Sequence, residues 1–448
     1  MRDTKLFNLF ATGLILTGAS LTATSAIAAD DPFGSFDLTE PSHYIEVKAA
    51  DRKSRSAISN LGFAIDEIRS DAVYFPGDLQ DLRKLREAGL KANAYPFRKE
   101  WTQEQFGIFA ERFISTDDTY KALGDMQKNY PGLATLFSMG KSVEGRDLLV
   151  LRLSGKTVAQ AEEQKLPVVL YTGCHHAREH LSVEIPLRFA KYMLENYGKN
   201  ADVTRLLDSR ELYVSPIINP DGHKHDYRDG LQGRMWRKNR ARNHDGSYGV
   251  DLNRNYGFGW GTGGSSTNPT SDVYMGPSAF SEPESRAVKA FVDSQPRMTS
   301  LISFHTFSEL VLYPWGHTYD KIGQKLGRAE DLPIFEKMAK DMASWNHYTP
   351  QQASDLYIAS GDTTDWAYGV HGIFAFTFEL SPSSMFGGGF YPSPNVVEPT
   401  FNANLKPMLY MLEYANDPSR VVREPRPDFD VTPSESGLGI ASFNDLKF

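Results

Sequence analysis

The stretch YTGCHHAREHLSVE, residues 171–184, combines three histidines with two glutamates. Histidine and glutamate three residues apart can point to the same side of a tight turn or a first helical turn, which suits a metal ion. His176 and Glu179 have this spacing, and His175 with Glu179, four residues apart, fits equally well. Spacing alone leaves that choice open. A lone HxxE pattern is also common by chance, as solvated polar residues at the start of a helix.

The elements that must position these residues are indicated by the flanking sequence. The apolar run LPVVLYTG at 166–173 is typical of a buried strand, and the helical pattern LSVEIPLRFAKYMLEN follows at 181–196. Buried strands interleaved with helices predict an α/β fold with a mixed, mostly parallel sheet and with ligands at the strand ends. Four further runs typical of buried strands lie at 148–155, 211–219, 299–307 and 372–380.

A smaller α+β region is expected before this fold. YIEVK at 44–48 alternates like a half-buried strand, and residues 63–75 indicate a second strand region that ends at a Pro-Gly turn. The leucines of DLQDLRKLREAGL then recur at helical spacing. We expect a separate unit over residues 30 to about 97, followed by a charged, helix-prone connector at 98–113.

The two ends of the chain are expected to lie outside the folded domains. Residues 1–29 contain early basic residues, an apolar run and the small-residue site Ala26-Ile27-Ala28, the layout of a cleaved secretory signal. An uncut membrane anchor is the alternative. The segment 417–448 is acidic, polar and rich in proline, and is expected to be a flexible tail.

Composition narrows the class of protein. A hydrophobic content of 40% and a charged content of 23% are ordinary for a globular protein, and the net charge of -8 argues against a nucleic-acid binder. No later segment is apolar for long enough to span a bilayer. Cys174 is the single cysteine, so no disulfide can form within the chain.

Three further motifs accompany the histidine stretch: GRMWRKNR at 233–240, GVDLNRNYGFGWG at 249–261 and SFHTFSELVLYPWG at 303–316. With these motifs the chain resembles the zinc metallocarboxypeptidases of the funnelin group, which are carboxypeptidase A/B-like, and especially the secreted bacterial branch typified by carboxypeptidase T. The likeness covers about 115–416. The region before it is similar to the family's prosegment.

The resemblance implies that His176, Glu179 and His305 hold one catalytic zinc ion. The separation of the two histidines is close to that of the family. Two imidazoles and one carboxylate, with a position left open, are the composition expected of catalytic rather than structural zinc. Asp251 matches the residue that accepts a hydrogen bond from the first histidine and thereby fixes its tautomer. The other two histidines of the opening stretch fall outside the implied ligand set.

The same resemblance implies roles in catalysis and substrate binding. Glu379 matches the general base that takes a proton from the attacking water, and Arg237 matches the arginine that steadies the developing oxyanion. Arg254, beside Asn253, matches the guanidinium that recognises the free terminal carboxylate of a substrate. Tyr357 matches a mobile hydroxyl that closes over the substrate.

Further matches concern recognition of the substrate's terminal carboxylate and of its last side chain. Arg178 matches a secondary carboxylate contact, and Arg234 is a weaker candidate of the same kind. The family's selectivity position is Thr364, while Asp362 could reach a basic head group from the side and Gly316 leaves the opposite wall open. We expect release of hydrophobic and also basic C-terminal residues. If Asp362 is instead turned into a structural hydrogen bond, only apolar residues would be favoured.

The chain also departs from the digestive branch of the family. His180 follows Glu179 where that branch usually has tryptophan, and Cys174 stands alone where that branch has stabilising disulfides. Both departures favour the bacterial branch. That branch often carries structural Ca2+, and this sequence has acidic loops but no recognisable calcium motif, so calcium is left open.

We therefore expect a signal peptide at 1–29, a propeptide at 30–113, a catalytic domain at 114–416 and a tail at 417–448. The expected protein is a monomeric zinc carboxypeptidase, secreted to the extracellular space or periplasm as a zymogen, that acts on peptide and protein C-termini after an activating protease has cut it. The alternatives are a cell-wall (muropeptide) metallopeptidase and a catalytically inactive binding relative. The carboxylate-binding residues favour ordinary C-termini, and the complete set of ligands and base argues against inactivity.

Overall fold

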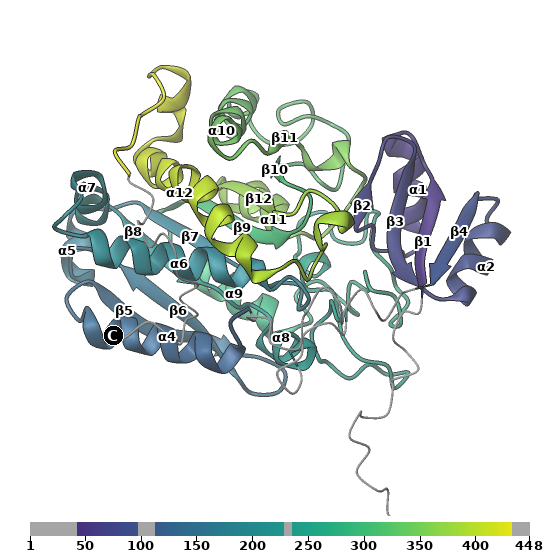
Figure 1. The fold of residues 1–448 in the computed structure, drawn as a ribbon. Coiled ribbons are helices and arrows are strands. Elements are labelled where there is room, and N and C mark those ends of the chain that lie inside the picture. Colours follow the sequence, from purple (N-terminus) through teal and green to yellow (C-terminus); the bar gives the residue numbers. More distant parts are fainter. Residues whose placement is uncertain (1–42, 97–112, 228–234, 432–448) are drawn as a thin grey trace, which may run out of the picture. The chain divides into compact units, whose positions relative to one another are not determined.

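The computed structural model describes residues 43–96, 113–227 and 235–431 (Figure 1). The expected signal peptide, nearly all of the connector, Arg234 and residues 432–448 lie outside the described residues.

The larger domain is built on an eight-stranded mixed sheet with the strand order β11-β10-β12-β9-β7-β8-β6-β5. The four central strands, β12, β9, β7 and β8, run parallel to one another. Antiparallel neighbours flank them, β10 against β12 on one side and β6 against β8 on the other. The strands are β5 Ala134–Lys141, β6 Asp147–Leu153, β7 Val168–Thr172, β8 Glu211–Ser215, β9 Met298–Thr306, β10 Leu310–Tyr313, β11 Thr349–Gln352 and β12 Phe374–Leu380.

Strand β7 illustrates how the sequence produces this sheet. All five of its residues are buried, and its side chains alternate between the two faces. Val169 and Tyr171 join one hydrophobic cluster, while Val168 and Leu170 join the other. A strand covered on both faces must be apolar throughout, which explains why the central strands are continuous apolar runs.

Helices cover both faces of the sheet (Figure 1). Helices α4, α6, α7, α10 and α12 contribute to the first cluster, α9 contributes to the second, and α11 contributes to both. The helices are α4 Thr116–Asn129, α5 Val158–Glu163, α6 Leu181–Asn196, α7 Ala201–Ser209, α8 Pro220–Asp226, α9 Pro283–Asp293, α10 Asp331–Asn346, α11 Thr363–His371 and α12 Val397–Glu413. The 3₁₀ turns are η2 Leu252–Arg254, η3 Ala353–Asp355, η4 Met385–Gly387, η5 Pro394–Val396, η6 Tyr414–Asn416 and η7 Pro418–Val422.

The predicted fold class is confirmed by this architecture. The sheet is mixed with a parallel centre and is flanked by helices. The helix expected at 181–196 has those same bounds as α6.

A smaller α+β region precedes this domain, as expected. It consists of a four-stranded antiparallel sheet in the order β2-β3-β1-β4, with two helices. Its core contains Ile45, Val47, Phe75 and Leu85. The elements are β1 His43–Lys48, α1 Arg52–Asn60, β2 Glu67–Ile68, β3 Ala72–Gly77, α2 Leu79–Glu87 and β4 Ala92–Pro96.

The strand region expected over residues 63–75 is divided into two strands, β2 and β3. The backbone bends at Ser70 and Asp71, two residue types that favour turns, and β2 and β3 pair across this bend as an antiparallel hairpin. The hairpin directs the residues before β2 toward the larger domain, where the hydroxyl of Tyr357 donates to the carbonyl of Ile65.

The segment after η6 differs from the expected flexible tail as far as residue 431. Val421 is 1% exposed and Phe429 is 2% exposed, and both belong to the first hydrophobic cluster. The guanidinium of Arg426 lies 4.3 Å from the ring centre of Trp345 on α10. Apolar residues spaced along a polar, proline-rich segment therefore attach it to the domain.

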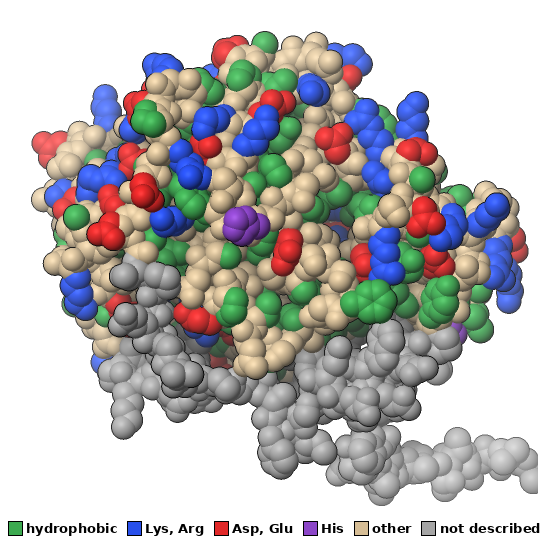
Figure 2. Space-filling view, turned by 45° about the horizontal axis from the view of Figure 1, so that its top comes forward, with side chains coloured by type: hydrophobic (Ala, Val, Ile, Leu, Met, Phe, Trp, Pro, Cys, Tyr) green, Lys and Arg blue, Asp and Glu red, His purple; other side chains and the backbone are tan. Residues whose placement is uncertain are grey.

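The described surface carries charges of both signs. Figure 2 shows lysine and arginine side chains interspersed with aspartate and glutamate on the face it presents. None of the helices in the described residues is both long enough and apolar enough to cross a bilayer.

Candidate active site and metal centre

Two histidines and a glutamate converge at the ends of neighbouring parallel strands. His176 and Glu179 lie in the loop between β7 and α6, and His305 lies near the end of β9, which pairs with β7. Oε1 of Glu179 is 2.7 Å from Nδ1 of His176, and Oε2 is 2.9 Å from Nδ1 of His305. All three side chains are buried. The sheet topology therefore brings His305 next to two residues that precede it by 126 and 129 positions in the sequence.

The donor atoms of this group fit a zinc ion. The Nδ1 atoms of His176 and His305 lie 3.2 Å apart, and one candidate ligand atom from each of the three residues falls within 4.8 Å of the others. Two imidazole nitrogens this close need a proton or a cation between them, because their lone pairs repel. Two histidines and one carboxylate are also a ligand set of catalytic zinc sites.

Hydrogen bonds behind the group orient both imidazoles. Nε2 of His176 is 3.0 Å from Oδ1 of Asp251, and Nε2 of His305 is 3.1 Å from Oγ of Ser303. Each outer nitrogen can therefore carry the ring proton, which leaves the Nδ1 lone pairs free for the metal. Asp251 is among the residues predicted from the sequence, whereas Ser303 is not. The signal for Ser303 is its position two residues before His305 on a strand, which puts both on the same face.

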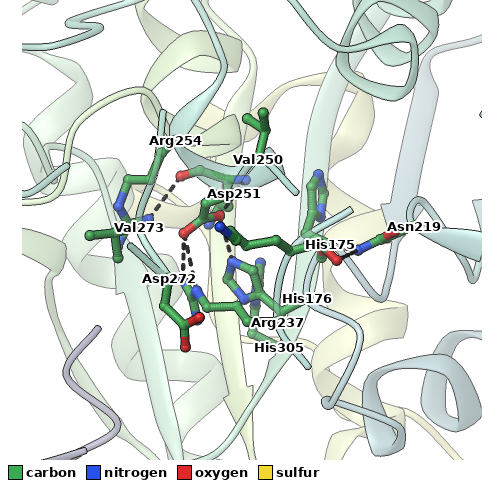
Figure 3. A network of polar contacts seen from close by, with 12 residues as sticks. His175, His176, Asn219, Arg237, Val250, Asp251, Arg254, Asp272, Val273 and His305 are labelled. Atoms are coloured by element: carbon green, nitrogen blue, oxygen red, sulfur yellow. Dashed lines mark hydrogen bonds and ion pairs between the residues drawn. The ribbon is translucent and has the colours of Figure 1, made fainter. Parts of the chain in front are cut away.

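Asp251 also holds Arg237. The Nε and Nη2 atoms of Arg237 donate to Oδ2 of Asp251 at 3.1 and 3.0 Å, so that the carboxylate lies between the arginine and His176 (Figure 3). Burial opposes ionisation, but Arg237 and His176 together hold the pKa of Asp251 well below its usual range. Nη1 of Arg237 remains 3.9 Å from Glu179 Oε1 and faces the metal group.

Glu379 lies on β12, directly opposite His305 of β9 in the parallel register. Its side chain lines the same cavity as the three converging residues. Burial, followed by the negative charge of Glu179, raises the pKa of Glu379 well above its usual range, with Arg237 acting in the opposite direction. A carboxyl group in such surroundings is poised for proton transfer.

The remaining histidines of the opening stretch bind elsewhere. Nε2 of His180 is 2.8 Å from Oδ2 of Asp226, and its Nδ1 is 3.0 Å from Nε2 of His223. The backbone carbonyl of His175 accepts from Asn219, and its ring contacts Tyr256. Neither ring belongs to the converging group.

Asn253 and Arg254 form the wall of the cavity beside the metal group. They belong to η2, whose first turn is fixed by Asp251, since Oδ1 of Asp251 accepts from the backbone N–H of Asn253 at 2.9 Å. Nε of Arg254 donates to Gly264 O, and Nη1 donates to Asn253 O. Nη2 of Arg254 makes no hydrogen bond to a described residue, so it can donate to an incoming anion.

Asp362 and Thr364, which are expected to line a specificity pocket, lie at the start of α11 and line the cavity. Oδ1 of Asp362 caps the helix by accepting from the backbone N–H groups of Thr364 and Asp365. Oδ2 faces Gly316, where an added Cβ would lie 3.0 Å away from it. Burial and the neighbouring Asp365 raise the pKa of Asp362 to about 7. The structural hydrogen bond and the cavity-facing carboxylate oxygen therefore coexist in one residue.

Arg178, which is expected to contact the carboxylate of a substrate, pairs with the small N-terminal region. Its Nη2 donates to Oδ1 of Asp66 at 2.7 Å, and both side chains are almost fully buried. Its guanidinium also lies 4.3 Å from the ring centre of Phe390. Residues 65–68 of the small region line the active-site cavity.

The cavity gathers nearly all of the residues singled out from the sequence. It has a volume of about 260 Å³. Asp251 lies behind the residues that line the cavity, where it contacts His176. Arg178 lies beside the cavity, where it contacts Asp66. The lining includes His176, Glu179, Arg237, Asn253, Arg254, His305, Gly316, Tyr357, Asp362, Thr364 and Glu379.

Residues 119–406 match the family model described as zinc carboxypeptidase. The chain belongs to the zinc carboxypeptidase family. It is similar to the zinc carboxypeptidase of Saccharothrix mutabilis subsp. capreolus, with 37% identity over 310 residues that cover 68% of this chain and 70% of that protein. It is also similar to carboxypeptidase A1 of Bos taurus, with 29% identity over 61% of this chain and 64% of that protein.

Solved structures share the fold. The crystal structure of the carboxypeptidase A from Helicoverpa armigera has a TM-score of 0.71 and 22% identity, and the match covers 87% of this chain and all of that one. The predicted membership is thus confirmed, and the chain is a zinc metallocarboxypeptidase.

Replacing His176 with alanine is expected to remove the metal. Loss of one of three ligands should lower the zinc content from about one ion per chain to near zero. Zinc per chain is measured by elemental analysis of the dialysed protein. The control His371→Ala removes an exposed histidine at the end of α11 and should retain the metal. Full zinc content in His176→Ala would exclude His176 as a ligand.

Proposed function

We propose that this zinc carboxypeptidase is secreted as a zymogen and removes single hydrophobic and basic residues from the C-termini of peptides and proteins. The observation that carries the proposal is the common cavity, in which the metal group, Glu379, Arg237 and the pair Asn253–Arg254 face one another. A site that hydrolyses a terminal peptide bond needs a base, an oxyanion donor and an anchor for the carboxylate that are close enough to contact the same substrate molecule.

The chemical step is assigned to two residues of the chain. Zinc, when bound by His176, Glu179 and His305, supplies a Lewis acid that polarises the scissile carbonyl. Glu379 accepts the proton of the attacking water and passes it to the departing amine. Arg237 donates to the developing oxyanion through Nη1, because Nε and Nη2 each donate to Asp251.

Binding of the substrate's terminal carboxylate is assigned to Asn253 and Arg254. The free Nη2 of Arg254 and the amide nitrogen of Asn253 supply donors along the cavity wall. These donors restrict hydrolysis to the last peptide bond of a chain, since an internal peptide has no carboxylate to place there. Tyr357 would turn its hydroxyl from Ile65 to the bound substrate.

The preference for the last side chain is assigned to the pocket between Gly316 and Asp362. The absence of a side chain at Gly316 leaves room for aromatic and aliphatic groups. Oδ2 of Asp362 can pair with a lysine or arginine head group, while Oδ1 continues to cap α11. Thr364 adds a small polar wall that excludes neither class.

Inhibition by the small N-terminal region is supported by two contacts in the cavity. The carboxylate of Asp66 pairs with buried Arg178, and the carbonyl of Ile65 accepts from Tyr357. Residues 65–68 thus take up substrate-binding groups from within the same chain. Nε of Arg178 and Oδ2 of Asp66 are buried without a hydrogen-bond partner in the described part of the chain, so the contact is incompletely satisfied. We infer that cleavage of the connector at 98–113 by an activating protease releases it.

Secretion is proposed from the signal-like residues 1–29. The catalytic reaction itself needs no partner other than the substrate.

Glu379→Gln tests the proposed reaction. The variant should retain about one zinc ion per chain and lose turnover about 100-fold or more, because an amide cannot serve as a general base. Turnover is measured with blocked dipeptides on chain cleaved in the connector, together with metal content. Turnover within a factor of two of the parent enzyme would remove Glu379 from the mechanism, and failure of the parent to hydrolyse any C-terminal bond would refute the function.

Asp66→Ala tests the inhibitory contact. Breaking one side of a buried ion pair is strongly unfavourable for the closed arrangement, so the uncut chain should hydrolyse small substrates about ten-fold faster or more. Asp71→Ala, at an exposed residue of the same small region, is the matched control. If uncut parent chain and connector-cleaved chain have equal rates, the small region does not inhibit.

Asp362→Asn tests the pocket. Asparagine can still cap α11, so the variant should fold normally while kcat/KM for arginine-ended dipeptides falls about ten-fold and that for phenylalanine-ended dipeptides changes little. The folded pKa of Asp362 is raised to about 7, so its charge appears as pH rises. In the parent enzyme the ratio of arginine to phenylalanine cleavage should therefore rise between pH 6 and 8, as expected for a group with a pKa of about 7.

The control for this change is Asp320→Asn, which removes a nearby negative charge outside the cavity lining. It should leave the ratio and its pH dependence unaltered. A pH-independent ratio in the parent enzyme, or equal losses for both substrates in Asp362→Asn, would contradict the assignment.

A further inference from the structure

His175 is fully buried beside the metal group and is not among the residues assigned to the reaction. Its imidazole stacks on that of His305, with ring centres 5.6 Å apart and an angle of 15° between the planes. Its two ring nitrogens are directed to opposite sides of the site, Nδ1 to β9 and Nε2 to the start of α11. A histidine in this position can connect β9 and the start of α11 through hydrogen bonds.

On the metal side, His175 connects to His305 through a hydroxyl group. Oγ of Ser303 lies 3.1 Å from Nε2 of His305 and 3.4 Å from Nδ1 of His175. When Nδ1 of His305 faces the metal, its proton is on Nε2 and is donated to Ser303. The hydroxyl proton of Ser303 is then available to an acceptor at Nδ1 of His175.

On the substrate side, His175 connects to Asn253 through a second hydroxyl group. Nε2 of His175 lies 3.1 Å from Oγ1 of Thr363 and 3.0 Å from the hydroxyl of Tyr256. Thr363 has one hydroxyl proton, and this proton goes to the side chain of Asn253, so Oγ1 of Thr363 accepts from His175. Nε2 of His175 therefore carries the ring proton, and Nδ1 is the acceptor. Oγ1 of Thr363 in turn donates to Oδ1 of Asn253 at 2.9 Å.

The orientation of the Asn253 amide follows from these contacts. The backbone N–H of Thr363 also donates to the same atom of Asn253, at 3.0 Å. A backbone N–H can only donate, so the receiving atom must be the carbonyl oxygen. The amide nitrogen of Asn253 is consequently turned away from Thr363. It makes no hydrogen bond to a described residue, and the side chain lines the cavity.

We propose that His175 is a positioning residue that links the zinc ligand His305 to the carboxylate-binding amide of Asn253, through Ser303 on one side and Thr363 on the other. This inference rests on the proposed function, because it concerns how that site holds the terminal carboxylate. The hydrogen bonds of this link all donate in the same direction, from His305 toward Asn253. The link keeps the amide nitrogen facing the substrate and fixes its distance from the metal ligands.

The test compares two ligands that engage different ends of the link. L-Phenylalanine, a product, offers a carboxylate to Asn253, whereas acetohydroxamate binds zinc without needing that contact. His175→Phe keeps the ring stack on His305 but removes both hydrogen bonds. We expect KM for a phenylalanine-ended dipeptide and Ki for L-phenylalanine to rise about ten-fold, the size of one lost hydrogen bond to a charged group, with kcat changed less. Ki for acetohydroxamate and zinc content should stay at parent values.

Three further variants make the result specific. Thr363→Val removes only the hydroxyl of the link and should give the same selective loss. His175→Gln retains an N–H donor toward Thr363 and should restore most of the affinity for L-phenylalanine. His371→Phe makes the same substitution at the exposed end of α11 and should change nothing.

The measurements are made on the zinc-loaded full-length chain after limited proteolysis of the connector. Calorimetric binding of L-phenylalanine to each variant provides a readout that is independent of turnover. Equal weakening of both ligands, loss of zinc, or an unchanged Ki for L-phenylalanine in His175→Phe would overturn the inference. If the parent enzyme hydrolyses no dipeptide, the proposed function fails instead, and the two failures are thereby distinguished.

Discussion

A single buried carboxylate, that of Asp251, organises the active site. Its Oδ1 atom holds His176 and begins the turn that carries Asn253, and its Oδ2 atom holds two donors of Arg237. Removing a fully buried carboxylate from water is costly unless it is paired and hydrogen-bonded on both oxygens, and here both oxygens are occupied. His176, Arg237 and the turn that carries Asn253 therefore share one fixed point, which sets their relative positions.

Much of the fold could be predicted because its determinants are local. The central strands are continuous apolar runs, and α6 begins and ends where its helical periodicity does. Strand β11, Thr349–Gln352, could not be predicted, because a short polar strand at the sheet edge carries no apolar pattern. The segment 417–431 was also misjudged in part, since polar composition concealed two residues that insert into the core.

Site residues that lie in a recognisable sequence motif could be predicted. Site residues whose role depends on a contact between distant parts of the chain could not. His176, Glu179 and His305 lie in recognisable strings, whereas Ser303 and Thr363 gain their roles only when β9 and α11 meet beside His175. The pairing of Arg178 with Asp66 is of the same kind, because it joins residues 112 positions apart. Neither residue has a local pattern that would reveal the other.

The burial of Phe429 bears on where the catalytic domain can be said to end. The match to the family model stops at residue 406, and proline-rich sequence begins shortly after α12. Yet Phe429 fills part of the core formed by α10 and α12, and Arg426 covers Trp345. A shortened protein that stopped at 416 would leave the apolar surface around Trp345 of α10 open to water. The physical limit of the domain thus extends beyond the limit that sequence similarity defines.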